Sequence, residues 1–424
     1  MKWLKHGVAA GRMLVVGGCL VVATTALAQS SGKAAKRGTI TVSDRAQRIH
    51  DAATLVDGHN DLPWKVRTEG SSTFDGMDIE KPQPKLHTDI PRLRDGGVKA
   101  QFWSVYVPAS TADDGKSLAT TLEQIAIVKS MIARYPDTFE LAGTVDDVQR
   151  ICAAGKIASL IGVEGGHSIE NSLAVLRQLY EQGARYMTLT HSATLDWADS
   201  ATDDERHDGL TPFGEEVVRE MNRLGMLVDL SHVSVATMKH ALRISETPVI
   251  FSHSSARAIA DHPRNVPDDV LRLTAENGGV VMVNFYSGFV VPSAGERWDA
   301  LAAHRKQLEV KHGDDKEKIR SELRSWWKRN PSPPGSIHVV LDHIDHIARV
   351  AGVDHVGLGS DYDGIDMTPV QLEDVSTYPR ITQGLLDRGY SEQDIHKILG
   401  GNVLRAMRQA EEASRRLRQS AGDE

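Results

Sequence analysis

Short apolar runs alternate with longer amphipathic stretches from about residue 48 onward. The short runs are rich in β-branched residues, as buried strands are, and there are eight of them: 54–59, 99–107, 157–164, 185–191, 226–232, 248–253, 279–285 and 355–361. Apolar residues at helical spacing occupy several of the intervals, as in 117–133, 213–224 and 234–242. Strands that alternate with helices predict βα units around a parallel sheet.

Polar side chains close most of these apolar runs. Six of the eight end in an imidazole or a carboxylate: His59, Glu164, His191, His232, His253 and Asp361. A (β/α)8 barrel gathers the carboxyl ends of all its strands at one mouth, where the active sites of such barrels lie. An open sheet would spread the same residues along a line. The pattern therefore predicts an α/β protein built on a closed (β/α)8 TIM barrel.

A long insertion separates the last two predicted strands. Its segment 297–330 is rich in Lys, Arg and Glu, and a proline-rich stretch follows before a helix that starts near Ile337. We interpret this helical insertion as a solvated cap or a subunit contact, so a homodimer is one arrangement left open. On the helix after it, His338, His343 and His346 have no carboxylate or cysteine to complete a ligand set, which favours a solvated helix face.

The amino-terminal segment 1–28 has the pattern of a signal peptide. Basic residues precede an apolar stretch at 13–26, and an A-x-A cleavage pattern ends at Ala28. An uncleaved anchor and a lipoprotein attached through Cys19 are the alternatives. We therefore expect an exported protein, periplasmic or secreted, with no stable membrane span once the signal has been removed.

The rest of the chain divides into a leader and one domain. The polar segment 29–45 predicts a flexible leader, and 46–415 is the predicted barrel domain. The formal net charge of −8 does not favour a nucleic-acid partner, which would require a concentrated basic face. Without the signal, Cys152 is the single cysteine, so no internal disulfide is predicted.

The string Asp57–Trp64 closes the first predicted strand and carries the sharpest local signal. Residues i and i+2 of a strand share a face, so His59 and Asp61 both project toward the mouth. One imidazole and one carboxylate suit zinc. A strand-end turn with a capping aspartate is the alternative.

Three further strand ends supply the remaining candidate ligands. Glu164 stands between glycines that would leave room for a ligand or metal, and its two oxygens could bridge two ions about 3.5–4 Å apart. An N-cap or an ion-pair partner is the alternative for this residue. His232 and His253 end consecutive strands and are therefore neighbours around a barrel rim. Together with His59 and Asp61, they predict a metal centre.

Three more residues suit substrate handling. His191 is not needed for the metal set, so it could stabilise the charge that develops on a carbonyl oxygen. Arg264 follows His253 in a loop and could hold a carboxylate with both arms of its guanidinium fork, although it could also be a surface arginine. Asp361 could shuttle a proton, and strand register favours it over its neighbour Asp363.

These motifs resemble those of the membrane (renal) dipeptidase family, peptidase family M19, among the amidohydrolase-like metal-dependent hydrolases. The resemblance spans roughly residues 46–410. It rests on Asp57–Trp64, Gly162–His167, Thr188–Ser192 with Trp197-Ala198-Asp199, Leu227–Met238, Val249–Ser255, Arg264–Leu271 and Gly359–Gly364.

The resemblance implies a zinc-dependent dipeptidase with two Zn²⁺ per subunit. By this resemblance His59 and Asp61 bind one ion, His232 and His253 bind the other, and Glu164 bridges them.

Substrate roles also follow from the resemblance: His191 and Arg264 would bind the dipeptide, and Asp361 would be the acid/base group. Members of the family often accept a C-terminal D-residue, and some open β-lactams. The alternatives are a metal-dependent hydrolase of another small amide, such as an N-acyl-D-amino acid, and a catalytically dead binding protein.

Overall fold

The computed structural model describes residues 37–313 and 315–421. Its parallel sheet contains β1 (Leu55–Asn60), β2 (Val98–Ser104), β3 (Phe139–Leu141), β4 (Ile157–Glu164), β5 (Ala184–Thr188), β6 (Leu227–Asp229), β7 (Ile250–Phe251), β8 (Val280–Val283) and β9 (Val356–Leu358). Pairings run from β2 through β1 to β9 and then down to β4, and the pairing of β2 with β4 closes the ring. The predicted closed barrel of eight parallel strands is confirmed.

All eight predicted strands are present, and β3 is an additional one. It pairs with the first half of β4 and lies outside the ring. With three residues it is too short to show a strand period in the sequence. The predicted strands 226–232 and 248–253 end early as strands, because the residues beyond them leave the ladder and turn toward the mouth. His232, for example, has a φ of 69°.

Side chains are buried on both faces of the barrel strands. Those that point into the barrel, among them Phe102, Tyr186 and Met282, form one apolar cluster. The outward side chains pack against the surrounding helices in a larger cluster. Burial on both faces explains why the strands read as continuous apolar runs and not as alternating patterns.

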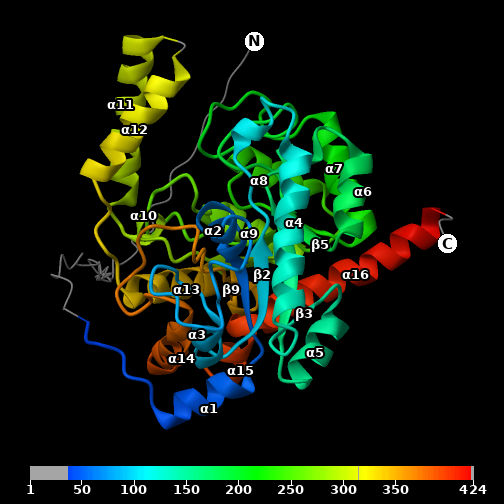
Figure 1. The fold of residues 1–424 in the computed structure, drawn as a ribbon, viewed down its shortest axis with the longest axis vertical. Helices are drawn as coiled ribbons and strands as arrows, with labels where there is room; N and C mark the ends of the chain where they lie inside the picture. Colours follow the sequence, from blue (N-terminus) through cyan, green and yellow to red (C-terminus); the bar gives the residue numbers. More distant parts are fainter. Residues whose placement is uncertain (1–36, 314, 422–424) are drawn as a thin grey trace, which may run out of the picture. The chain divides into compact units, whose positions relative to one another are not determined.

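Helices cover the outside of the barrel (Figure 1). They are α1 (Asp44–Ala52), α2 (Leu62–Glu69), α3 (Ile90–Asp95), α4 (Ser117–Arg134), α5 (Val145–Ala153), α6 (Leu173–Glu181), α7 (Pro212–Leu224), α8 (Val235–Ile244), α9 (Asp268–Asn277), α10 (Ser287–Val290), α11 (Ala294–His312), α12 (Lys316–Arg329), α13 (Ile337–Ala351), α14 (Tyr378–Asp387), α15 (Glu392–His396) and α16 (Asn402–Ala421). The three predicted helices correspond to α4, α7 and α8, and the Ser234 side chain caps α8 by accepting from the Thr237 amide.

The insertion between β8 and β9 is helical, as predicted. Its helices α11 and α12 pack against each other as a hairpin, drawn in yellow in Figure 1. The hairpin lies beside the mouth, since Arg305 of α11 is 3.8 Å from Asp203 in the loop that follows β5. None of the described side chains of α12 is fully buried.

The prediction of a solvated histidine face on α13 is wrong for two of its histidines. His343 is fully buried: its Nδ1 accepts from the Ala256 amide at 3.0 Å, and its Nε2 donates to the Val290 carbonyl at 2.9 Å. His346 is also buried and lies 2.7 Å from Asp268. Both histidines lie on the same stripe as the buried apolar residues of the helix. Backbone groups satisfy the ring nitrogens of His343, and the side chains of Asp268 and Arg349 satisfy those of His346.

The predicted signal segment lies outside the described residues. Within 37–313 and 315–421, no helix is both long enough and apolar enough to cross a bilayer.

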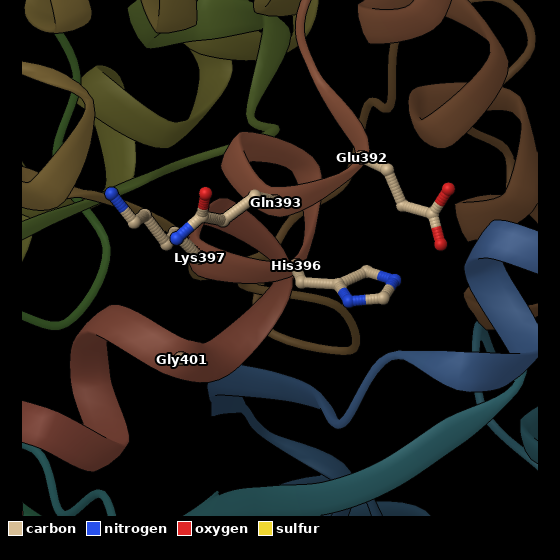
Figure 2. A pocket seen from close by; sticks show the side chains of 5 residues that line it. All are labelled: Glu392, Gln393, His396, Lys397 and Gly401. Carbon is tan, nitrogen blue, oxygen red and sulfur yellow. The ribbon is translucent and has the colours of Figure 1, made fainter.

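A surface hollow of about 530 Å³ lies at the amino end of the barrel, opposite the mouth. Its wall includes Gly401 of the turn 397–401, whose neighbour Gly400 packs against the Thr54 carbonyl just before β1. Figure 2 shows the lining side chains of Gln393 and Lys397 on one side and those of Glu392 and His396 on the other. Because these groups do not converge on a common point, we assign no function to the hollow.

Candidate active site at the barrel mouth

Glu164 stands at the centre of a cluster of buried polar side chains at the carboxyl end of β4. Its two carboxylate oxygens face different neighbours. Oε2 lies 3.4 Å from His59 Nε2 and accepts a hydrogen bond from Ser104 at 3.0 Å. Oε1 lies 3.1 Å from His232 Nε2 and 3.5 Å from His253 Nε2. One carboxylate thus joins two sets of candidate ligands.

The first set comes from the end of β1. His59 Nε2 lies 3.2 Å from Asp61 Oδ2. Val56 and Gly58 face the barrel interior, so a regular strand would turn His59 outward. The pairing of β1 with β2 is irregular between Asp57 and Asn60, and an irregularity of this kind re-aims a side chain. It accounts for the inward direction of the His59 ring.

The second set comes from the residues that follow β6 and β7. His232 Nε2 and His253 Nε2 lie 2.8 Å apart. The Nδ1 of His253 is 2.8 Å from the Ser252 hydroxyl, which itself donates to Asp229 at 2.7 Å. The hydroxyl proton is therefore committed to Asp229, so the ring must donate from Nδ1. With the ring proton on Nδ1, Nε2 carries the lone pair, and this is the form in which an imidazole can bind a metal ion through Nε2.

A tyrosine orients the other ring. Tyr186 Oη lies 2.9 Å from His59 Nδ1, and the tyrosine reaches it because Gly162 has no side chain. A Cβ at Gly162 would lie 2.0 Å from Tyr186 Cζ, and one at Gly166 would lie 2.5 Å from the Trp197 ring. The interpretation of the glycines around Glu164 as space for a ligand is wrong at these two positions, where aromatic side chains fill the space.

The electrostatics differ between the two halves of the cluster. Although burial opposes it, the neighbouring tyrosine and carboxylates hold the pKa of His59 well above its ordinary value. Burial, together with the positive charge of Arg264, holds the pKa of His232 well below its ordinary value, and burial does the same for His253. The first set therefore favours a positive charge on His59, and the second set offers the neutral imidazoles of His232 and His253.

The cluster fits metal ions by chemistry as well as by position. His59 Nε2 and Asp61 Oδ1 are buried without a hydrogen-bond partner among the described residues, which is costly unless another group binds them. Ligand atoms lie within 4.8 Å of one another in three groups: His59 with Glu164 and His253, His59 with Asp61 and Asp361, and Glu164 with His191 and His232. Imidazoles and carboxylates at this spacing are a donor set for zinc and related transition metals.

His191 lies at the edge of the second set. Its Nε2 is 3.6 Å from Glu164 Oε1, and its ring lies between those of Tyr106 and His232, at 4.8 Å and 4.3 Å. Burial lowers the pKa of His191 to about 4, so the ring is neutral at physiological pH. A neutral ring carries one N–H, which it can donate to an oxyanion.

Asp361 lies beside the first set, and Asp363 does not. Asp361 is buried, and its Oδ2 accepts from Asn284 at 2.9 Å. Burial, with a further contribution from Asp61, raises the pKa of Asp361 to about 8. Asp363 instead accepts from the His87 amide at 2.8 Å. The geometry therefore favours Asp361 over Asp363 as a group that exchanges protons at the site.

Arg264 brings a buried positive charge to the mouth. Its guanidinium is 2% exposed and donates to the Ser254 hydroxyl and to the His253 carbonyl, at 3.3 Å and 3.2 Å. Its Nε has no hydrogen-bond partner, and the guanidinium forms no ion pair with any described carboxylate. Burial lowers the pKa of Arg264 to about 10, so the group remains charged. A buried guanidinium without an anionic partner has the charge and the geometry to accept a carboxylate.

The sequence profile of the membrane dipeptidases, peptidase family M19, matches residues 43–421. The chain belongs to this family. It is therefore a metal-dependent dipeptidase, and the resemblance drawn from its motifs is confirmed.

Solved structures with the same fold include other dipeptidases. The probable dipeptidase PvdM from Pseudomonas aeruginosa has a TM-score of 0.77 and 23% identity, over 87% of this chain and 98% of that one. A metallo peptidase from Rhodobacter sphaeroides, liganded with a phosphinate mimic of the dipeptide L-Ala-D-Ala, has a TM-score of 0.69 and 23% identity, over 84% of this chain and 99% of that one. The dipeptidase AC, a metallo peptidase of family M19, has a TM-score of 0.69 and 24% identity, over 84% and 98%.

Two buried aspartates of this dipeptidase were missed by the sequence reasoning. Asp229 accepts from the amide and hydroxyl of Ser252, at 2.8 Å and 2.7 Å. Asp57 accepts in the same way from Ser360, at 2.8 Å and 2.7 Å. Each serine directly precedes a site residue, His253 or Asp361. The available signal was a carboxylate inside an otherwise apolar strand, which is costly to bury unless it holds something in place.

Proposed function

We propose that this dipeptidase holds two zinc ions per subunit and uses them to hydrolyse dipeptides. The observation that carries the proposal is the orientation of Glu164, whose Oε2 faces His59 at 3.4 Å while its Oε1 faces His232 at 3.1 Å. A bridging ligand of a two-metal site needs one oxygen for each ion. His59 and Asp61 would hold one ion, and His232 and His253 the other. Three imidazoles among five ligands favour zinc over magnesium or calcium.

The chain's own residues supply the proton transfers. When bound, the metal pair would supply a water molecule that is activated at neutral pH, and the ions would also polarise the scissile carbonyl. Asp361 takes the proton from the attacking water and returns it to the leaving amine. Burial raises the pKa of Asp361 to about 8, and bound cations would lower that pKa and so favour the ionised form that accepts the proton. His191 donates its ring N–H to the oxyanion that forms at the carbonyl.

Arg264 supplies the preference for dipeptides. Its unpaired guanidinium would bind the C-terminal carboxylate of the substrate, and in a longer peptide the next residue would displace that contact. Dipeptides with a C-terminal D-residue belong to the proposed substrate range. The structurally similar peptidase from Rhodobacter sphaeroides, liganded with a mimic of L-Ala-D-Ala, supports their inclusion.

We further propose that the protein is exported. The support is the pattern of 1–28, with basic residues, an apolar stretch and an A-x-A site. Determination of the amino-terminal residue of the protein recovered from the periplasm or medium tests this, and Gln29 is the expected result. A protein that retains Met1 and remains in the cytoplasm would refute export.

A substrate panel tests the proposed activity. Purified protein is assayed with L,L- and L,D-dipeptides, a tripeptide, N-acyl-D-amino acids and a β-lactam, before and after chelation and again after zinc is restored. We expect the dipeptides to be hydrolysed, the tripeptide to be resistant, and activity to follow zinc. Preferred hydrolysis of the N-acyl-D-amino acids would instead establish the small-amide alternative. A protein that is inactive on every substrate with zinc bound would be a binding protein.

A further inference from the structure

The inserted hairpin rests on the loop that carries Arg264. Gly295, in the first turn of α11, lies so close to Asp261 that a Cβ atom would be 2.3 Å from the Asp261 carbonyl oxygen. One turn later, the ring of Trp298 lies 4.9 Å from the ring of His262. The hairpin therefore contacts the Arg264 loop at two consecutive positions that lie just before the arginine.

His262 links this contact to Arg264. The histidine is 2% exposed, and its Nδ1 accepts from the Arg264 amide at 3.2 Å. Its ring also lies 4.7 Å from that of Phe289, and the Phe289 ring centre lies 5.2 Å from Arg264 Cζ. Trp298, His262 and Phe289 thus form a continuous row of ring contacts that ends at the guanidinium. A shift of Trp298 would be transmitted along this row to the direction of the guanidinium fork.

The hairpin also reaches the loop that follows His191. Arg305 lies 3.8 Å from Asp203 in that loop. Within the same loop, the Ser200 hydroxyl donates to the His191 carbonyl at 2.6 Å. The hairpin therefore contacts both loops that carry the two proposed substrate-binding residues.

We propose that the α11–α12 hairpin is a substrate-recognition element, which positions Arg264 through Trp298 and His262 and so sets the affinity for the substrate's C-terminal carboxylate. This inference rests on the proposed function, in which Arg264 binds that carboxylate. Trp298 and His262 are positioning residues, because they act through Arg264. A displacement of about 1 Å in a group that orients the substrate can cost up to about 100-fold. The side chains of the proposed metal ligands and of Asp361 are not part of this row of contacts, so KM should change and kcat should not.

Comparing a dipeptide with its C-terminal amide isolates the contribution of the carboxylate. For wild-type enzyme we expect KM to be about 100-fold lower for the acid than for the amide, as for two charge-assisted hydrogen bonds. Trp298→Ala should raise KM for the acid about 10-fold, keep kcat within about twofold, and leave the kinetics of the amide unchanged. Trp298→Phe should restore most of the lost affinity because it keeps an aromatic ring against His262.

Two further variants separate positioning from general damage. Gly295→Ala places a methyl group against the Asp261 carbonyl and should produce the same selective rise in KM. Trp326→Ala is the matched control, because Trp326 lies in the same hairpin and its ring lies 6.2 Å from that of His304, on α11. This control should leave KM for the acid unchanged.

The outcomes distinguish this inference from the proposed function. If Trp298→Ala and Gly295→Ala affect acid and amide equally, or lower kcat, the residues are only structural and the inference is overturned. The same holds if both variants match wild type while wild type strongly prefers the acid. If wild type hydrolyses dipeptides without preferring the acid, the carboxylate role of Arg264 fails, and the inference fails with it.

Discussion

The chain of hydrogen bonds from Asp229 through Ser252 to His253 predicts how one substitution should weaken metal binding. In Asp229→Asn, the remaining carbonyl oxygen can keep the two backbone amides that Asp229 now accepts, those of Ser231 and Ser252, at 3.1 Å and 2.8 Å. The amide nitrogen must then face the Ser252 hydroxyl and donate to it. The hydroxyl proton turns toward His253 Nδ1, so the ring proton moves to Nε2, the atom that would bind the metal.

The size of the effect follows from the hydrogen bond that metal binding would then break. To bind, His253 must return its proton to Nδ1, where it would face the hydroxyl proton of Ser252. Leaving one buried polar pair unsatisfied costs about 1–3 kcal/mol. This corresponds to a loss of about 10- to 100-fold in metal affinity, the range usual for partners of metal-binding histidines.

Zinc titration of metal-free protein in competition with a chromophoric chelator measures both binding constants. We expect one of the two sites to weaken in Asp229→Asn. The matched control is Asp57→Asn, which removes an equally buried carboxylate that accepts from Ser360, from Tyr378 and from the backbone amide of His59, but from no histidine ring. Both variants should unfold at a lower temperature, but only Asp229→Asn should lose affinity. Wild-type affinity in Asp229→Asn, or an equal loss in the control, would refute the reasoning.

Three other predictions test separate parts of the account. Asp361→Asn should lower kcat about 10²–10⁴-fold while the protein keeps its zinc, as measured by metal analysis, and loss of zinc would contradict the assigned role. His343 has a pKa lowered by burial to about 4 from an ordinary 6.5, so its contribution to stability is complete above pH 6.5 and is lost as pH falls toward 4. Between pH 6.5 and 4, the free energy of unfolding in urea should fall by about 3 kcal/mol less for His343→Gln than for wild type. If the free energies of the two proteins change in parallel with pH, His343 does not make this contribution. Gly162→Ala should destabilise the protein by about 1–3 kcal/mol because its Cβ would lie 2.0 Å from Tyr186 Cζ, and unchanged unfolding would exclude that crowding.

The barrel and the candidate ligands could be predicted from the sequence because both depend on strand ends. Each strand is buried on both faces, so it reads as an apolar run, and a charged or imidazole group marks where the run stops. Barrel topology then brings those ends together without any knowledge of side-chain contacts. His59, Glu164 and His253 could be found in this way because each stands within two residues of the end of its strand.

The partners of these residues could not be predicted, because they come from neighbouring strands. Asp229 holds Ser252 on the next strand, and Tyr186 reaches His59 across the barrel. Neither contact is visible without the register of the sheet. The glycine at 162 was interpreted as ligand space because the sequence does not show which side chain fills the gap.

Exposed and buried positions were also hard to distinguish from the sequence on α11 and α13, which lie between β8 and β9. His343 stands on an amphipathic helix where its polarity favoured solvent, but the Ala256 amide and the Val290 carbonyl approach its two ring nitrogens. These contacts depend on the tertiary fold, which the spacing of apolar residues along the helix does not reveal. The same limit applies to Trp298, whose contact with His262 joins segments from separate βα units.

The zinc-to-protein ratio of purified, active enzyme shows whether Glu164 bridges a pair of ions. Glu164 and the four proposed ligands around it should hold two ions, so elemental analysis should give two zinc per chain, and dipeptidase activity should fall in proportion as a chelator removes them. A preparation with a ratio near zero and full activity would contradict the account.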